Sequence, residues 1–122
     1  MALLDGVRRF LRRMAESDEQ RLDDEIREWA SSVPGTTAIA DAKPREHAKM
    51  AGVVRRITIR PVEGYESLEA LLSDGTGDIH VVWMGRRSIQ GLTLGTRLVV
   101  DGVLGGGRSG PKMVNPRFEF SA

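Results

Sequence analysis

Residues 67–84 read SLEALLSDGTGDIHVVWM, in which two apolar runs are separated by the short segment Asp74-Gly75-Thr76-Gly77. Strand-forming residues on both sides of a short Asp-Gly turn are typical of a β-hairpin. The register that this turn favours brings three apolar pairs to one side of the hairpin: Leu72 and Ile79, Ala70 and Val81, and Leu68 and Trp83. The outward side then holds Glu69, Leu71, His80 and Val82. We therefore expect one apolar face and one mixed face.

Three further strands are predicted around this hairpin. The first covers about Ala48–Arg60 and contains Gly52, as is typical of a bend in a barrel strand. Its apolar phase changes near Arg55–Arg56, where one extra residue, a β-bulge, accounts for the change. The other two cover Thr96–Leu104 and Lys112–Phe120. Five strands within about 75 residues leave no room for crossover helices, and they predict a mainly β fold with a five-stranded antiparallel barrel.

The first third of the chain has a helical pattern. Its apolar residues recur at spacings of one, three and four, which places them on one face of an amphipathic helix: Leu3, Leu4, Val7, Phe10, Leu11 and Met14. Ser17 with Gln20 three residues later is typical of a capping box, so this part is either one helix or two with a break at Ser17. We expect a helical N-terminal extension over residues 1–33, a linker over 34–47 and a barrel over 48–122.

The charges are unevenly distributed. The chain has 18 Lys and Arg against 17 Asp and Glu, but residues 1–43 carry 7 basic and 9 acidic side chains, whereas residues 44–122 carry 11 and 8. The predicted barrel is thus net positive (+3) and its extension net negative (−2). Of the 18 basic residues 15 are arginine, a usage that indicates a GC-rich bacterial genome.

Cysteine is absent, which excludes disulfide scaffolds, thiolate zinc sites and cysteine nucleophiles. The two histidines, His47 and His80, have no metal-ligand spacing and no nucleophile in a recognisable arrangement. We therefore expect no catalytic residues, no metal, no cofactor and no enzymatic activity. No apolar run approaches the roughly 18–20 residues of a membrane span and no secretory signal is recognisable, which predicts a cytoplasmic location.

The ordered set of motifs resembles the OB-fold anticodon-binding-like family, and the last of them is most similar to the wedge domain of the RecG helicases. The motifs are MAGVV at 50–54, LLSDGTG at 71–77, VWMG at 82–85, LVVDG at 98–102 and KMVNPRFE at 112–119. As a whole the chain resembles small stand-alone bacterial OB-fold proteins that bind nucleic acid. The resemblance implies an OB-type barrel that binds single-stranded DNA or RNA, or branched nucleic acid, across its second and third strands.

Arginine and lysine pair with phosphates, and arginine also stacks on bases. In the predicted barrel these residues gather on the first strand, after the third strand and around the glycine-rich connection 105–110. Tyr65 and His80 are the outward side chains able to stack on a base, whereas Trp83, Phe118 and Phe120 are expected in the core. The predicted nucleic-acid-binding residues are Lys49, Arg55, Arg56, Tyr65, His80, Arg86, Arg87, Arg108 and Lys112. Because stackers are few, we expect charge to dominate the binding.

The alternative function is a protein-interaction OB domain. An outer apolar stripe is expected at Leu71, Val82, Val99 and Val103. Such a stripe needs cover, which the apolar face of the N-terminal helix supplies on its own barrel or on that of a partner, including a homodimer. The acidic segment 16–28 directly after the arginine-rich helix start argues against a membrane partner.

Overall fold

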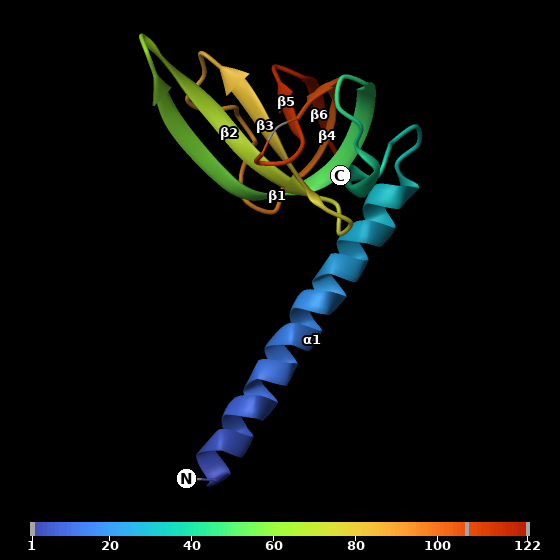
Figure 1. Ribbon diagram of the computed structural model, residues 1–122, viewed down its shortest axis with the longest axis vertical. Helices are drawn as coiled ribbons and strands as arrows, with labels where there is room; N and C mark the ends of the chain where they lie inside the picture. The colour runs from blue at the N-terminus through green and yellow to red at the C-terminus, as the bar shows by residue number, and fades with distance from the viewer. Residues whose placement is uncertain (1, 107, 122) are drawn as a thin grey trace.

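The computed structural model describes residues 2–106 and 108–121. A single long helix precedes a short 3-10 helix and six strands (Figure 1). Their bounds are α1 Ala2–Ser32, η1 Ile39–Asp41, β1 His47–Val62, β2 Tyr65–Ser73, β3 Asp78–Met84, β4 Arg97–Gly105, β5 Lys112–Val114 and β6 Arg117–Phe120. Of the glycine-rich connection between β4 and β5, Gly107 lies outside the described residues.

Five of the strands close into a ring. The order is β1-β2-β3-β5-β4, and β4 pairs back with β1, so the mainly β, five-stranded barrel with a helical N-terminal extension is confirmed. The expectation of a wholly antiparallel barrel is wrong, because β3 and β5 run parallel. The last predicted strand is divided at Asn115-Pro116. Asn115 has φ 50°, outside the strand region, and Pro116 has no N–H for a ladder. The chain therefore leaves β3 after β5 and continues along β4 as β6.

Strand β1 closes the ring because it pairs with β4 through its first half and with β2 through its second half. The predicted extra residue is confirmed: the β1–β2 register shifts between Val54 and Arg56. At Gly52 a Cβ atom would meet the Leu72 Cβ at 3.1 Å and the Ser73 carbonyl oxygen at 3.2 Å, so β1 lies against β2 without room for a side chain at this position.

The predicted hairpin register is confirmed for all three apolar pairs, and all six side chains are buried. Trp83 belongs to the same core and packs edge-to-face on the half-buried Phe118, with ring centroids 5.4 Å apart. Phe120 was expected in the core, but it is 45% exposed, because β6 extends past the ring along the edge of β4.

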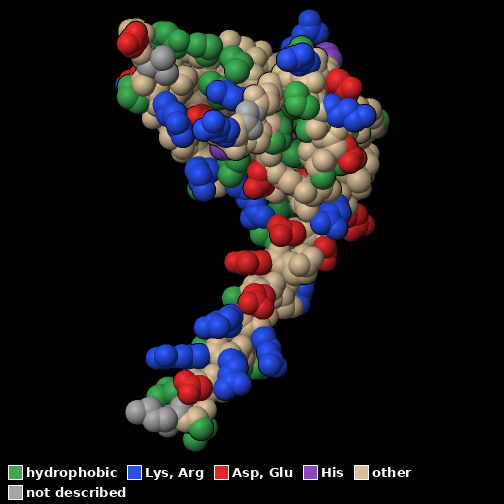
Figure 2. Space-filling model, viewed as in Figure 1, with side chains coloured by type: hydrophobic (Ala, Val, Ile, Leu, Met, Phe, Trp, Pro, Cys, Tyr) green, Lys and Arg blue, Asp and Glu red, His purple; other side chains and the backbone are tan. Residues whose placement is uncertain are grey.

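The N-terminal extension is one continuous helix of 31 residues. In Figure 1 it runs away from the barrel, so that its first residues lie far from the sheet. Only Ile26 and Ala30 of α1 are buried, and Ala30 packs on Ala51 and Val99 of the outer barrel surface. Figure 2 shows the other end of α1 separate from the barrel, with basic and apolar side chains on its surface.

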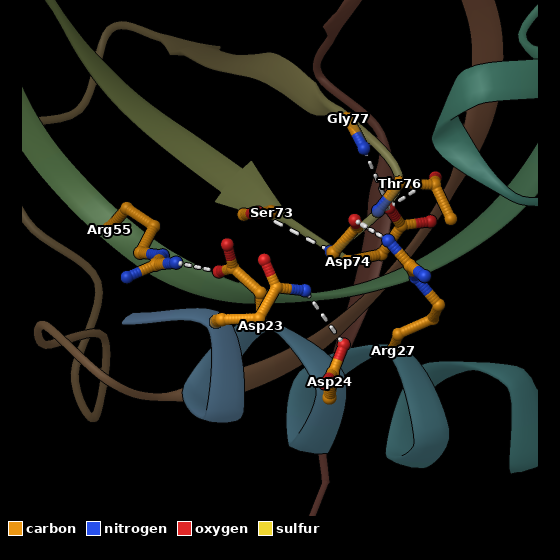
Figure 3. Close-up of polar contacts among 10 residues, drawn as sticks. Asp23, Asp24, Arg27, Arg55, Ser73, Asp74, Thr76 and Gly77 are labelled. Carbon is orange, nitrogen blue, oxygen red and sulfur yellow. Dashed lines mark hydrogen bonds and ion pairs between the residues drawn. The ribbon is translucent and has the colours of Figure 1, made fainter. Parts of the chain in front are cut away.

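Two polar contacts fix the docked end of α1 (Figure 3). Arg55 donates to the Asp23 carboxylate at 2.7 Å, and Arg27 donates to the Gly75 carbonyl oxygen at 2.8 Å. The helix is thereby attached to β1 and to the β2–β3 turn.

The expected outer apolar stripe is not formed. Val99 is buried under the end of α1, Val82 is 8% exposed and Leu71 is half-buried, which leaves Val103 as the one exposed member. The apolar face at the start of α1 does not cover the barrel of its own chain. Within residues 2–106 and 108–121, no helix combines the length and the hydropathy that crossing a bilayer requires.

Candidate nucleic-acid interface

The outer side of β2, β3 and β5 carries an open cavity of about 480 Å³. It lies between the β1–β2 turn and the β4–β5 connection, since its lining includes both Tyr65, which follows that turn, and Arg108 of the connection. Four of the nine predicted binding residues line it: Tyr65, His80, Arg108 and Lys112. The structure thus brings together side chains from three strands and a loop that are separated by up to 47 positions in the sequence (112 − 65).

The alternation of strand side chains explains this arrangement. Leu68, Ala70 and Leu72 of β2 point into the core, as do Ile79 and Val81 of β3. The residues that alternate with them, Glu69, Leu71 and His80, therefore point outward. His80 pairs with Leu71 on one side and with Lys112 on the other, which places a ring and an ammonium group side by side on the outer surface.

Glu69 lies within this cavity as its acidic member. Its carboxylate accepts from Arg60 Nε at 2.9 Å and lies 3.1 Å from His80 Nδ1, and its side chain is 16% exposed. Against this one carboxylate the cavity holds three basic side chains, those of Arg60, Arg108 and Lys112. The lining is therefore net positive, and part of its positive charge is already paired.

Arg60 was not among the predicted binding residues. A signal for it existed, because counting by twos along β1 after the bulge leads from Arg56 to Arg60 on one face. Arg56 itself is exposed and pairs with Leu71, whose other neighbour is His80, so it lies on the same side of the sheet as the cavity.

The other predicted residues lie elsewhere on the surface. Arg55 lines a groove beside α1 and is bound to Asp23, and Lys49 lies opposite Asp101 in the ladder between β1 and β4. Arg87 pairs with Glu66 at 2.6 Å, next to Tyr65 at one rim of the cavity, and Arg86 is exposed beside it. The structure therefore groups five of the nine on one face, sets two at its rim and places two away from it.

A second open cavity, of about 780 Å³, lies beside β4 and includes an exposed contact between the His47 ring and the Asp101 carboxylate. Among the described residues no group of three or more His, Cys, Asp or Glu side chains is placed to hold a metal ion.

These features define a small closed β-barrel with a polar, net-positive outer face and a long helical extension. No family model matches the sequence, and no curated protein matches it. Among solved structures, the chain is similar to RecG in the structure of RecG bound to three-way DNA junction. The TM-score is 0.57 and the sequence identity 20%, over 66% of this chain and 12% of that one. The likeness to RecG expected from the sequence is thus confirmed for the fold, and the chain corresponds to a small part of that protein's length.

Proposed function

We propose that this protein is a non-catalytic module that binds single-stranded or branched nucleic acid on the outer face of β2, β3 and β5. One observation carries the proposal: two rings able to stack on bases and three basic side chains line the same open cavity. A nucleic-acid strand presents these two chemistries together, since its bases have π-faces and its backbone is a row of phosphates.

The residues have distinct roles in this proposal. Arg108 and Lys112 contact phosphates, as does Arg60 when it leaves Glu69, while Tyr65 and His80 stack on successive bases. Tyr65 is 42% exposed and the His80 side chain 30%, so both present part of a ring to a ligand. Two rings form a small stacking platform, and charge therefore supplies most of the affinity.

The similarity to RecG, which was solved on a three-way DNA junction, supports this class of ligand through the shared fold. Branched nucleic acid is for that reason tested beside a plain single strand. The affinities measured for single-stranded DNA and for single-stranded RNA then give the preference between the two.

The test is the fluorescence anisotropy of labelled single-stranded DNA, single-stranded RNA and a three-way DNA junction over a series of salt concentrations. On a single strand each neutralised phosphate contributes about 0.7 to the log–log slope of affinity against salt. Arg108→Ala with Lys112→Ala should lower that slope by up to about 1.4. Tyr65→Ala should weaken binding at every salt concentration, because stacking releases no counterions. Tyr65→Phe should restore binding, because phenylalanine keeps the aromatic ring.

A matched control removes two arginines of α1 far from the cavity, Arg12→Ala with Arg13→Ala. We expect this variant to keep the slope of the natural chain. An equal loss of slope in both double variants would show that binding follows overall charge, and no binding of any probe at low salt would refute the proposed function.

A further inference from the structure

The projecting part of α1 carries an uncovered apolar stripe. Six side chains are between 49% and 84% exposed: Leu3, Leu4, Val7, Phe10, Leu11 and Met14. Leu4, Val7, Leu11 and Met14 follow one another at intervals of three, four and three, so they lie on one face of the helix. A helix gains most of its stability in proteins from packing such a face. The stripe therefore indicates a docking surface.

The charges of α1 divide the helix into two halves of opposite sign. Residues 2–14 carry four arginines and one aspartate, a net charge of +3. Residues 15–32 carry seven acidic residues and two arginines, a net charge of −5. Figure 2 shows this division, with Lys and Arg side chains toward the free end of the helix and Asp and Glu side chains nearer the barrel.

We propose that α1 pairs in antiparallel orientation with α1 of a second copy of this chain. In this orientation residues 2–9 of each copy lie beside residues 16–23 of the other, which brings Arg8 and Arg9 near Glu16, whereas a parallel pair sets like charges side by side along the whole helix. With Leu11 and Met14 next to the two-fold axis, Leu3 and Leu4 of one copy lie near Leu22 of the other. Leu22 is 46% exposed and thus available for this contact.

The barrel leaves room for the second helix. Continuing the spacing of the stripe beyond Met14 leads to four exposed charged residues, Asp18, Arg21, Glu25 and Glu28. The contacts between α1 and the barrel begin near Leu22: Leu22 and Glu25 line a groove beside β1, and Asp23, Arg27 and Ala30 touch the barrel directly. With the two-fold axis between Leu11 and Met14, the partner helix runs beside residues 2–23 and so ends where the contact with the barrel begins.

A membrane surface is the competing occupant for an arginine-rich amphipathic helix. Because α1 is continuous, its net −5 half lies on the same axis as its basic half. Binding flat to an anionic bilayer would bring that acidic half to the same surface, which opposes adsorption.

The first test is sedimentation equilibrium of the full chain without nucleic acid, so that its result is independent of the proposed function. We expect a dimer whose affinity falls as salt rises. Val7→Glu with Leu11→Glu should raise the dissociation constant at least about a hundredfold, since it alters two contacts in each copy. Arg9→Gln with Arg12→Gln changes the net charge by the same −2, on the opposite face of the helix, and should retain most of the dimer.

The second test fixes the orientation. The sequence has no cysteine, so introduced thiols report directly on proximity. The Leu4→Cys with Leu22→Cys variant should form disulfide-linked dimers on oxidation, and Leu4→Cys alone should form few. Efficient linking by Leu4→Cys alone would show a parallel pair and overturn the proposal. A chain that stays monomeric at every concentration would also overturn the proposal. If that monomer sediments with phosphatidylglycerol vesicles, the stripe binds a membrane surface instead.

Discussion

The carboxylate of Asp74 accepts a hydrogen bond from the backbone N–H of Ile39 at 2.8 Å and so joins the β2–β3 turn to the segment before β1. Its other oxygen accepts from the Thr76 N–H at 2.8 Å and from the Thr76 hydroxyl at 2.6 Å. Asp74 is 4% exposed and Ile39 is 3% exposed. One buried side chain therefore stabilises the turn and also holds an apolar residue of the preceding segment in the core.

Asp74→Ala should destabilise the protein by about 3 kcal/mol, because it leaves the buried N–H of Ile39 and the part-buried N–H groups of Thr76 and Gly77 without an acceptor. Urea denaturation measures the change. Asp78→Ala is the matched control at the other end of the turn: this carboxylate is exposed, so its loss should cost less than about 0.5 kcal/mol. Equal effects of the two substitutions would show that the hydrogen bonds of Asp74 contribute no net stability.

Gly75→Ala should loosen the contact between α1 and the barrel. Gly75 has φ +83°, and a Cβ there would lie 2.6 Å from the Asp23 carbonyl oxygen and 2.9 Å from the Arg27 Cβ. Gly64→Ala is the control, since Gly64 has a similar φ of +78° and open space around it. Both variants pay the cost of left-handed backbone, about 1 kcal/mol, and only Gly75→Ala should also speed proteolysis near the end of α1.

Gly52→Ala should lower the melting temperature more than Gly105→Ala. Both glycines lie in barrel strands, but a Cβ at Gly52 meets β2 at 3.1 Å, whereas at Gly105 its nearest neighbour is at the ordinary distance of 3.5 Å. Crowding in a packed interior costs about 1–3 kcal/mol. Similar melting temperatures for the two variants would show that β1 can move away from β2 without cost.

Local periodicity predicted most of the barrel. The hairpin register and the bulge in β1 follow from which side each residue faces, and the period of two determines that directly. Ile39 could not be found in this way, because it is the one large apolar side chain of the short 3-10 helix η1 and belongs to no repeating pattern. Its burial depends on Asp74, which is 35 positions away. The segment 34–47 therefore looked like a simple linker although it contributes to the core.

The candidate site was predicted only in part, again because contacts between distant segments decide where a side chain lies. Arg55 and Arg56 are adjacent in the sequence, but the bulge directs Arg55 to Asp23 on α1 and Arg56 to the outer face beside Leu71. The capping box at Ser17 was similarly ambiguous. The helix runs through Ser17 as a single element, and the sequence alone left both possibilities open.

Glu69→Gln should strengthen nucleic-acid binding, if the proposed face is the binding face. The substitution removes the one carboxylate that lines the cavity and releases Arg60 and His80 from it. We expect about threefold or more tighter binding of a single-stranded oligonucleotide at low salt. The gain should shrink as salt rises, since screening weakens the repulsion between the carboxylate and the phosphates.

Glu119→Gln is the matched control for this prediction, because it removes the same charge from an exposed position on β6, which pairs only along β4 and not with β2, β3 or β5 in the described chain. It should change the affinity by less than half as much on a free-energy scale. Equal gains from both variants would mean that net charge, and not the position of Glu69, controls binding. Weaker binding by Glu69→Gln would mean that the carboxylate holds Arg60 and His80 in the orientation that the nucleic acid requires.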